Sequence, residues 1–238
     1  PARRRNKLYL NNQDNTFTEK AVEYGIADEG YSIMANFFDY DGDGDLDLYV
    51  ANQPPAATQL RKNIKPSDTQ YTDRLYRNDG QRFTDVTVAA GVQNNCFSLS
   101  ATASDFNDDG YPDLYVASDY DEPDLFYQNN GDGTFTNVAN EALQHISNFS
   151  MGADVADINN DGYMDLFTAD MVAEDNFRNK TNMSSMAVEK FWGLVKMGYH
   201  YQFMFNSLQL NNGNGTFSEI AQMSGVSKTD WSWSALLV

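Results

Sequence analysis

The sequence predicts an all-β protein, a β-propeller of four-stranded blades, and three observations support this fold class. Four blocks of the chain repeat one pattern, each block reads as about four short strands, and Asn, Asp and Gly mark the turns between them. The blocks cover residues 7–53, 74–119, 125–171 and 207–238, with inserts at 54–73 and 172–206. We expect residues 1–238 to form a single partial propeller domain, with four blades visible of a seven- or eight-bladed ring.

The anchors of the repeat keep a strict spacing. Each block has a phenylalanine after a turn, at Phe17, Phe83, Phe135 and Phe217. Fourteen residues later comes an aromatic residue followed by serine, at Tyr31-Ser32, Phe97-Ser98, Phe149-Ser150 and Trp231-Ser232. Eight residues further, an acidic loop opens in the first three blocks, at Asp39, Asp105 and Asp157. Constant spacing in so many copies indicates a repeat protein.

Each block can be divided into elements in order. Its first segment, for example LFYQNNGDGTFT, has two apolar runs around a turn rich in Asn and Gly, which predicts a β-hairpin. The segment before the acidic loop (FSLSATAS in the second block) predicts a strand with small side chains, and the segment after it (DLYVAS) predicts another. Each block therefore supplies the strands of about one blade.

The inserts separate these elements. Residues 54–73 are polar and contain Pro, so we expect a surface loop. Near 184–198 a serine cap precedes apolar residues at helical spacing, Val188, Phe191, Trp192 and Val195, which predicts a short amphipathic helix. The aromatic residues of this second insert form a candidate contact surface, and packing against the propeller explains them equally well.

The three acidic loops share the pattern D-x-[DN]-x-D-G-x-x-D, which predicts three Ca²⁺ sites. Side chains at positions 1, 3 and 5 converge when glycine at position 6 allows a sharp bend, position 7 offers its carbonyl, and position 9 completes the ligand set. Such oxygen ligands suit Ca²⁺ better than Mg²⁺ or a transition metal. The predicted ligands are Asp39, Asp41, Asp43, Asp45 and Asp47; Asp105, Asn107, Asp109, Tyr111 and Asp113; and Asp157, Asn159, Asp161, Tyr163 and Asp165.

An EF-hand opens with a similar loop, but it requires glutamate at position 12 and an exiting helix. In this chain position 12 is Val50, Val116 or Thr168, within a predicted strand. The EF-hand interpretation is therefore rejected.

Composition limits the possible partners. The formal net charge of −18 argues against nucleic acid and anionic membranes as partners, and no apolar run is long enough to span a bilayer.

The chain starts PARRRNK without Met, and a step of 22 residues from Phe217 places a fourth acidic loop at position 239. We therefore expect a longer protein around this segment, whose open edge is completed by later repeats or by another chain.

The loops, the NNGDGTF hairpin and the FSMG strand resemble the FG-GAP/VCBS repeats of calcium-bearing β-propellers such as integrin α-subunit heads. Within that group, DRLYRNDGQ, FNDDGYPDLYVASD and EKFWGLVKMGYHYQ resemble secreted bacterial relatives of cartilage acidic protein, the ASPIC/UnbV-linked group. The resemblance covers residues 7–238. It implies that the loop residues named above bind calcium, and that the protein is extracellular or at the cell surface.

Two functions are consistent with these features. The favoured hypothesis is a secreted, non-enzymatic calcium-binding module for adhesion, matrix or assembly, whose partners are other protein chains, copies of itself or glycans. The alternative is calcium-dependent binding or cleavage of acidic polysaccharide. Only two histidines occur, His145 and His200, far apart in the sequence, and no catalytic motif is present, so we expect no enzyme.

Overall fold

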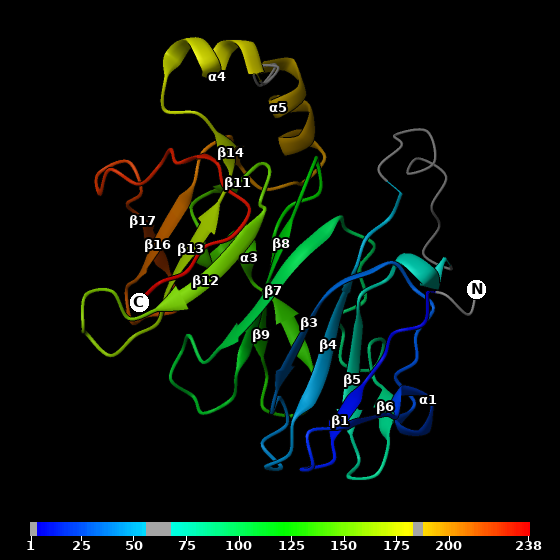
Figure 1. Ribbon diagram of the computed structural model, residues 1–238. Coiled ribbons are helices and arrows are strands. Elements are labelled where there is room, and N and C mark those ends of the chain that lie inside the picture. Colours follow the sequence, from blue (N-terminus) through cyan, green and yellow to red (C-terminus); the bar gives the residue numbers. More distant parts are fainter. Residues whose placement is uncertain (1–3, 56–67, 183–187) are drawn as a thin grey trace.

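The computed structural model describes residues 4–55, 68–182 and 188–238, and most of its strands form three antiparallel four-stranded sheets (Figure 1). The first blade contains β3 (Ser32–Phe38), β4 (Asp47–Asn52), β5 (Arg74–Asn78) and β6 (Phe83–Asp85). The second contains β7 (Ser98–Ser104), β8 (Asp113–Ser118), β9 (Leu125–Asn129) and β10 (Phe135–Asn137). The third contains β12 (Gly152–Ala156), β13 (Asp165–Ala169), β16 (Ser207–Asn211) and β17 (Phe217–Glu219). The prediction of an all-β fold of propeller blades is confirmed, with three four-stranded blades in the described residues where four were expected.

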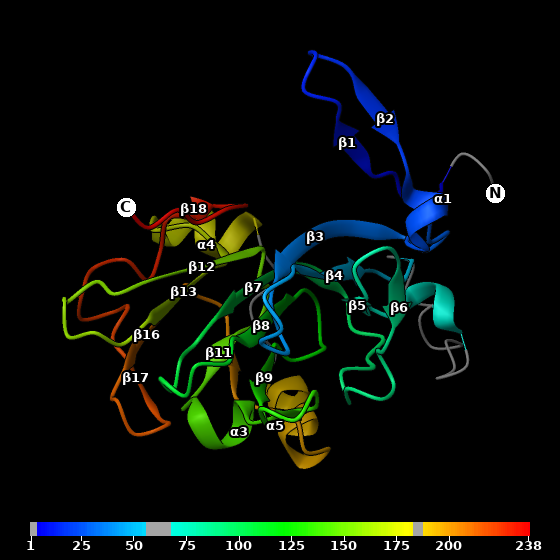
Figure 2. The same ribbon diagram turned by 90° about the horizontal axis from the view of Figure 1, so that it is seen from below.

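Shorter elements connect the blades. A separate hairpin of β1 (Tyr9–Asn11) and β2 (Phe17–Glu19) stands apart from the sheets (Figure 2). Two small pairs are β11 (Ile146–Ser147) with β15 (Gln202–Phe203), and β14 (Met171–Val172) with β18 (Asp230–Trp231). One-turn helices α1 (Ala21–Tyr24) and α3 (Ala139–Ala142) and a 3₁₀ turn at Thr69–Tyr71 complete the connections. None of the helices in the described ranges is both long and apolar enough to cross a membrane.

The second insert is helical, as predicted, and contains more helix than expected. Helix α5 (Val188–Lys196) confirms the predicted amphipathic segment, whereas the serines expected to cap it lie outside the described residues. Helix α4 (Asn176–Asn182) was not predicted because its polar sequence has no apolar periodicity. Its start is stabilised by Asp175, whose carboxylate accepts the Arg178 N–H at 2.8 Å. Residues 56–67 of the first insert also lie outside the described ranges.

The sequence repeat and the structural blade are out of phase. Hairpin β5–β6 belongs to the second sequence block, yet β5 pairs with β4 of the first block. Hairpins β9–β10 and β16–β17 likewise complete the blades begun by the preceding blocks. The second and third blocks therefore each end one sheet and begin the next, while every blade is itself a continuous stretch of chain whose strands follow one another in sequence order.

Aromatic side chains fill the space between the blades. Tyr40 of the first blade stacks on Phe135 of the second, with ring centroids 5.9 Å apart. Phe106 of the second blade contacts Phe217 of the third, also at 5.9 Å. The repeated hairpin phenylalanine is thus buried at three positions, whereas Phe17 in the detached hairpin is 61% exposed.

A buried aspartate joins consecutive blades at the ends of the strands away from the acidic loops. The Asp73 carboxylate accepts hydrogen bonds from the Tyr49 hydroxyl (2.8 Å) and the Asn52 N–H (2.7 Å) of its own blade. It also accepts one from the Ser98 hydroxyl (2.7 Å) of the next blade. This contact gives the serine of the aromatic-Ser pair a role in the second block, because the Ser98 hydroxyl connects one blade to the next.

The same connection recurs at Asp124, which accepts hydrogen bonds from Tyr115, from the Ser118 N–H and from the Ser150 hydroxyl of the third blade. Burial raises the pKa of Asp73 to about 6 and that of Asp124 to about 7. In the third blade the corresponding residue is Asn206, whose side-chain oxygen accepts the Asp170 N–H at 2.8 Å. An amide can therefore occupy this position in the same fold.

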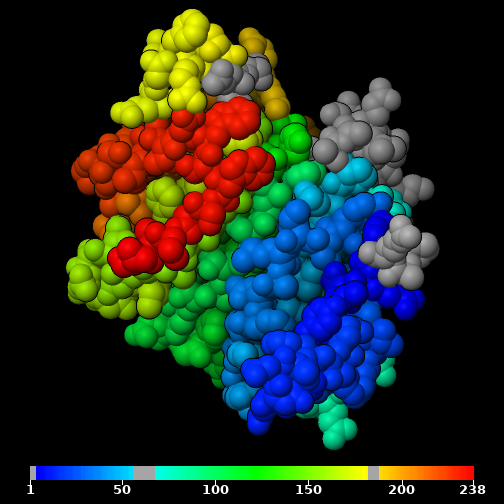
Figure 3. Space-filling view, viewed as in Figure 1, coloured from blue at the N-terminus to red at the C-terminus, as the bar shows by residue number. Residues whose placement is uncertain are grey.

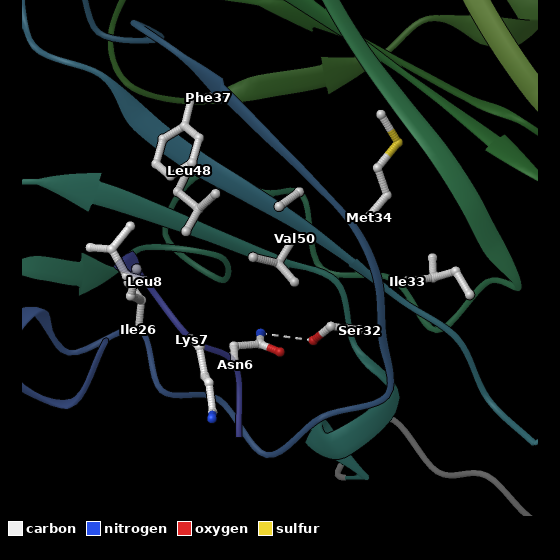
Figure 4. A pocket seen from close by; sticks show the side chains of 11 residues that line it. Asn6, Lys7, Leu8, Ile26, Ser32, Ile33, Met34, Phe37, Leu48 and Val50 are labelled. Carbon is white, nitrogen blue, oxygen red and sulfur yellow. Dashed lines mark hydrogen bonds between the residues drawn. The ribbon is translucent and has the colours of Figure 1, made fainter. Parts of the chain in front are cut away.

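The flank of the first blade is open. A groove of about 270 Å³ is lined by apolar residues that include Leu8, Ile26, Phe37 and Leu48 (Figure 4). Phe37 is 45% exposed there. The equivalent face of the second blade is packed against the first blade. Among the described residues, the second blade therefore has no such groove on this face.

The C-terminal residues lie along the third blade. They run beside β12 across the surface seen in Figure 3, and the Leu237 N–H donates to the Asp154 carboxylate at 2.7 Å. Gly152 permits this approach, since a Cβ there would lie 2.9 Å from the Trp233 carbonyl oxygen.

The buried aspartates predict a pH dependence of stability. Because the pKa of folded Asp124 is about 7, above its ordinary value of 3.8, the folded state binds more protons and loses stability as pH rises through this interval. Between about pH 5 and about pH 8, the free energy of unfolding of the wild type in chelator should fall. The fall in Asp124→Asn should be smaller by on the order of 1–3 kcal/mol. Denaturant titrations measure this, and equal pH slopes in the two proteins would contradict it.

Candidate metal centres

The three acidic loops connect the first and second strands of the three blades. They follow β3, β7 and β12 and lead into β4, β8 and β13, so the common strand order places them at the same end of each sheet. The hairpin turns of β5–β6, β9–β10 and β16–β17 lie at this end as well, and contact the loops. The repeated sequence thus produces a repeated loop position.

Positive backbone φ angles bend each loop. The glycines at position 6, Gly44, Gly110 and Gly162, have φ of 92°, 91° and 94°. A Cβ at any of these three would meet nothing within 4 Å, so the requirement for glycine comes from the backbone and not from crowding. At position 4, Asp108 and Asn160 also have positive φ, 60° and 59°, a conformation that Asp and Asn tolerate better than most residues.

The aspartate at position 1 organises each loop. One carboxylate oxygen of Asp39, Asp105 or Asp157 accepts the N–H of the position-6 glycine, at 2.9, 2.8 and 2.9 Å. The other oxygen accepts a second backbone N–H from position 4 or 5. The loop is therefore wrapped around the first aspartate by its own backbone.

In the first loop three carboxylates converge as predicted. Oxygen atoms of Asp39, Asp41 and Asp43 lie within 4.8 Å of one another. Asp41 Oδ1 is buried and has no hydrogen-bond partner among the described residues. Burial, followed by the neighbouring Asp43 carboxylate, raises the pKa of Asp41. These residues fit a bound cation, because oxygen-only ligands and an unpaired buried carboxylate oxygen are what a hard divalent ion satisfies.

The second and third loops have asparagine at position 3. The Asn107 amide nitrogen donates to the Asp109 carboxylate at 2.8 Å, and Asn159 donates to Asp161 at the same distance. The structure thus brings positions 3 and 5 together in these loops too. Over positions 1, 3, 5 and 9, each of these loops has three carboxylates and one amide oxygen, where the first loop has four carboxylates.

Position 7 was predicted to contribute its carbonyl, and its side chain has a second role. The Tyr163 ring covers Gly213 in the hairpin turn of its blade, where an added Cβ would lie 2.6 Å from the ring. Tyr111 covers Gly131 in the same way and also contacts Gly42 of the first loop. In the first loop this position is Asp45, where partial burial and the charge of Asp43 raise the carboxyl pKa.

The aspartate at position 9 is buried and braces the loop against the adjacent hairpin. Both oxygens of Asp113 accept backbone N–H groups, from Phe106 at 3.1 Å and from Asn129 at 2.8 Å. Asp47 and Asp165 make the equivalent pairs of hydrogen bonds. Burial raises the pKa of Asp47 to about 6 and of Asp113 to about 7, and also raises that of Asp165. Their role as cation ligands stays a prediction, while their structural role is evident from these contacts.

Sequence reasoning missed one set of residues at this end of the molecule. The first asparagine of each hairpin turn, Asn78, Asn129 or Asn211, donates its backbone N–H to the position-9 carboxylate and its side-chain amide to a loop carbonyl. The asparagine was visible in the repeat, but we assigned it only to the turn.

The two histidines lie elsewhere, at the contact between the second insert and the propeller. His145 directly precedes β11, and His200 lies two residues before β15, the strand that pairs with β11. His200 is buried, with Nε2 at 3.0 Å from the Leu143 carbonyl oxygen, and burial lowers its pKa. His145 packs against Phe203 and lies 3.5 Å from the Glu219 carboxylate. Both histidines therefore make packing contacts, in segments of the chain separate from the acidic loops.

Comparison with known families gives a match to the FG-GAP-like repeat at residues 2–50 and 105–168. The first segment contains the first acidic loop, and the second contains the other two. The two matched segments are similar to FG-GAP-like repeats, which supports a repeat protein of the β-propeller type.

Among solved structures, one similar chain belongs to work on the specific recognition of non-reducing terminal N-acetylglucosamine by an Agrocybe aegerita lectin. It shares 17% sequence identity with a TM-score of 0.42, over 93% of this chain and 49% of the lectin chain. The present chain thus spans about half the length of that lectin. No curated protein matches the sequence significantly.

The bracing contacts predict different effects for two aspartates of the second loop. In chelator at about pH 8, Asp113→Asn should lower the free energy of unfolding by roughly 1–3 kcal/mol, because an amide cannot accept both N–H groups. Asp109→Asn, at an exposed position among like charges, should be neutral or slightly stabilising in chelator. Denaturant titrations compare the two, and a neutral Asp113→Asn would show that the bracing role is wrong.

Proposed function

We propose that this chain is an extracellular calcium-binding repeat protein, a non-enzymatic module for adhesion, matrix or assembly, in which Ca²⁺ rigidifies the blade loops. The observation that carries the proposal is the convergence of Asp39, Asp41 and Asp43 around an unpaired buried carboxylate oxygen. The same loop conformation recurs in all three blades. We expect one Ca²⁺ in each loop, three in total.

The ligand chemistry supports calcium over other ions. The predicted ligands are carboxylate, amide and carbonyl oxygens, without nitrogen or sulfur, which disfavours transition metals. Mg²⁺ demands a small, nearly ideal octahedral shell, whereas Ca²⁺ accepts more oxygens in irregular arrangements. Loops without the glutamate at position 12 are expected to bind at submillimolar to millimolar calcium, a range that suits extracellular fluid.

The effect of the ions follows from the position of the loops. Each loop joins two adjacent strands and contacts a hairpin turn through its ninth residue. Neutralising the aspartates removes repulsion that otherwise favours opening of this connection. Calcium therefore stabilises the blade at its acidic end, while the aromatic interface and the buried aspartates stabilise the rest.

The location of the protein is proposed from its sequence, and its partners are proposed from its exposed apolar side chains. The resemblance to secreted relatives of cartilage acidic protein supports an extracellular location, as does the net charge of −18, which calcium partly neutralises. Exposed apolar side chains on the flank of the first blade and on the second insert, such as Phe37 and Trp192, support contacts with other protein chains or with copies of this one.

Calcium should raise the thermal stability of the chain. Binding to the folded state alone adds about 2.7 kcal/mol per site at a free concentration about 100 times Kd, which corresponds to a rise in Tm of roughly 5 °C or more. Scanning calorimetry in chelator, in calcium and in equal magnesium measures this, with magnesium expected to give a smaller rise. An identical Tm in chelator and calcium would refute the proposal.

A matched pair of triple variants separates specific binding from charge screening. Asp39→Asn, Asp105→Asn and Asp157→Asn together should abolish the calcium-dependent rise in Tm. The control changes Glu141, Glu174 and Glu189 to Gln, which alters the net charge equally at exposed positions outside the loops. This control should retain the rise, and its loss there would indicate a general effect of charge.

A further inference from the structure

Consecutive acidic loops are joined by a single side chain. Asn129, buried in the second blade, donates its side-chain amide to the Tyr40 carbonyl oxygen of the first loop at 2.7 Å. The same amide nitrogen donates to the Pro112 carbonyl oxygen of the second loop at 3.1 Å. Its backbone N–H donates to Asp113, also in the second loop. One residue thus holds two candidate cation sites at once.

The next blade repeats the arrangement. Asn211 donates its side-chain amide to the Phe106 carbonyl oxygen of the second loop at 2.8 Å and to the Met164 carbonyl oxygen of the third loop at 3.1 Å. Its backbone N–H donates to Asp165 at 2.8 Å. Two buried asparagines therefore connect the three loops in series.

An aromatic contact accompanies the first connection. The Tyr111 ring, at position 7 of the second loop, lies against Gly42 of the first, where an added Cβ would be 3.3 Å from the ring. The residues joined by Asn129 flank the proposed ligands directly, since Tyr40 lies between Asp39 and Asp41, and Pro112 lies between Tyr111 and Asp113. A shift in either loop is therefore transmitted to ligand positions in the other.

We propose that Asn129 and Asn211 are positioning residues that couple the three cation sites, so that ordering one loop favours cation binding in its neighbour. This inference rests on the proposed calcium binding. Repulsion among un-neutralised aspartates favours an open loop, and closing it requires ordering of the backbone. When the second loop is closed, Asn129 is fixed by Asp113 and Pro112 and its amide is aimed at Tyr40. The first loop then needs less ordering of its own, which is positive cooperativity.

The first blade supplies a matched control. Asn78 occupies the same position as Asn129 and makes the same contacts within its own blade, with Asp47 through its N–H and with the Leu46 carbonyl oxygen through its amide. Its described hydrogen bonds reach no second acidic loop. Changing Asn78 removes the local bracing of one loop without removing a connection between loops.

A protein with two remaining sites tests the coupling most simply. Asp157→Ala with Asp161→Ala disables the third loop, and calcium is then titrated calorimetrically into the otherwise intact chain. We expect two ions to bind with positive cooperativity, the first raising the affinity for the second about fivefold or more. In the same background Asn129→Ser, whose hydroxyl is too short to reach Tyr40, should reduce this factor to about one.

The control and the second pair of sites complete the experiment. Asn78→Ser in that background should weaken binding to the first loop but keep the cooperativity. If Asn129→Ser fails to fold, as judged by circular dichroism, Asn211→Ser is tested with the first loop disabled by Asp39→Ala and Asp43→Ala. Absence of any binding heat refutes the proposed calcium function. Two ions binding independently, or cooperativity that survives loss of the asparagine, overturns the coupling while leaving that function intact.

Discussion

The buried aspartate at the end of each acidic loop is the constraint on which the arrangement of this molecule depends. Asp113 places both carboxylate oxygens against backbone N–H groups, one in its own loop and one in the hairpin of the same blade. Burying a carboxylate is unfavourable unless its oxygens are paired, so the loop and the hairpin are held in one relative position. The convergence of the ligand side chains, the orientation of Asn129 and the packing of Tyr111 all follow from that position.

Neighbouring blades are joined through side chains. Each blade is a continuous stretch of chain with its four strands in sequence order, so among the described residues no sheet borrows a strand from the next blade. The buried connections through Asp73 and Asp124 join neighbouring blades at one end, and the asparagines Asn129 and Asn211 join them at the other. Two independent polar connections therefore hold each aromatic interface in register.

The flanks of the blades show what happens where contacts with a neighbouring blade are incomplete. Phe17 occupies the hairpin position that is buried in the other blocks, yet it is 61% exposed because no inner strands pair with β1 among the described residues. Ile158, at the loop position filled by Tyr40 and Phe106 in the other blades, is 40% exposed. These residues carry the apolar pattern of an inter-blade core, and no opposing blade covers them among the described residues.

The sequence by itself determined the strands, the repeat and the three acidic loops, because these depend on local alternation, on turn residues and on glycine at positive φ. It also predicted helix α5, whose apolar periodicity is local, and it missed α4, which has none. Only the tertiary structure decided which strands share a sheet, since pairing β5 with β4 joins two sequence blocks. It likewise decided that position 9 braces a hairpin, that Ser98 and Ser150 each bind a buried aspartate, and that one asparagine spans two loops. Those roles arise from contacts between residues distant in the chain, which spacing along the sequence does not encode.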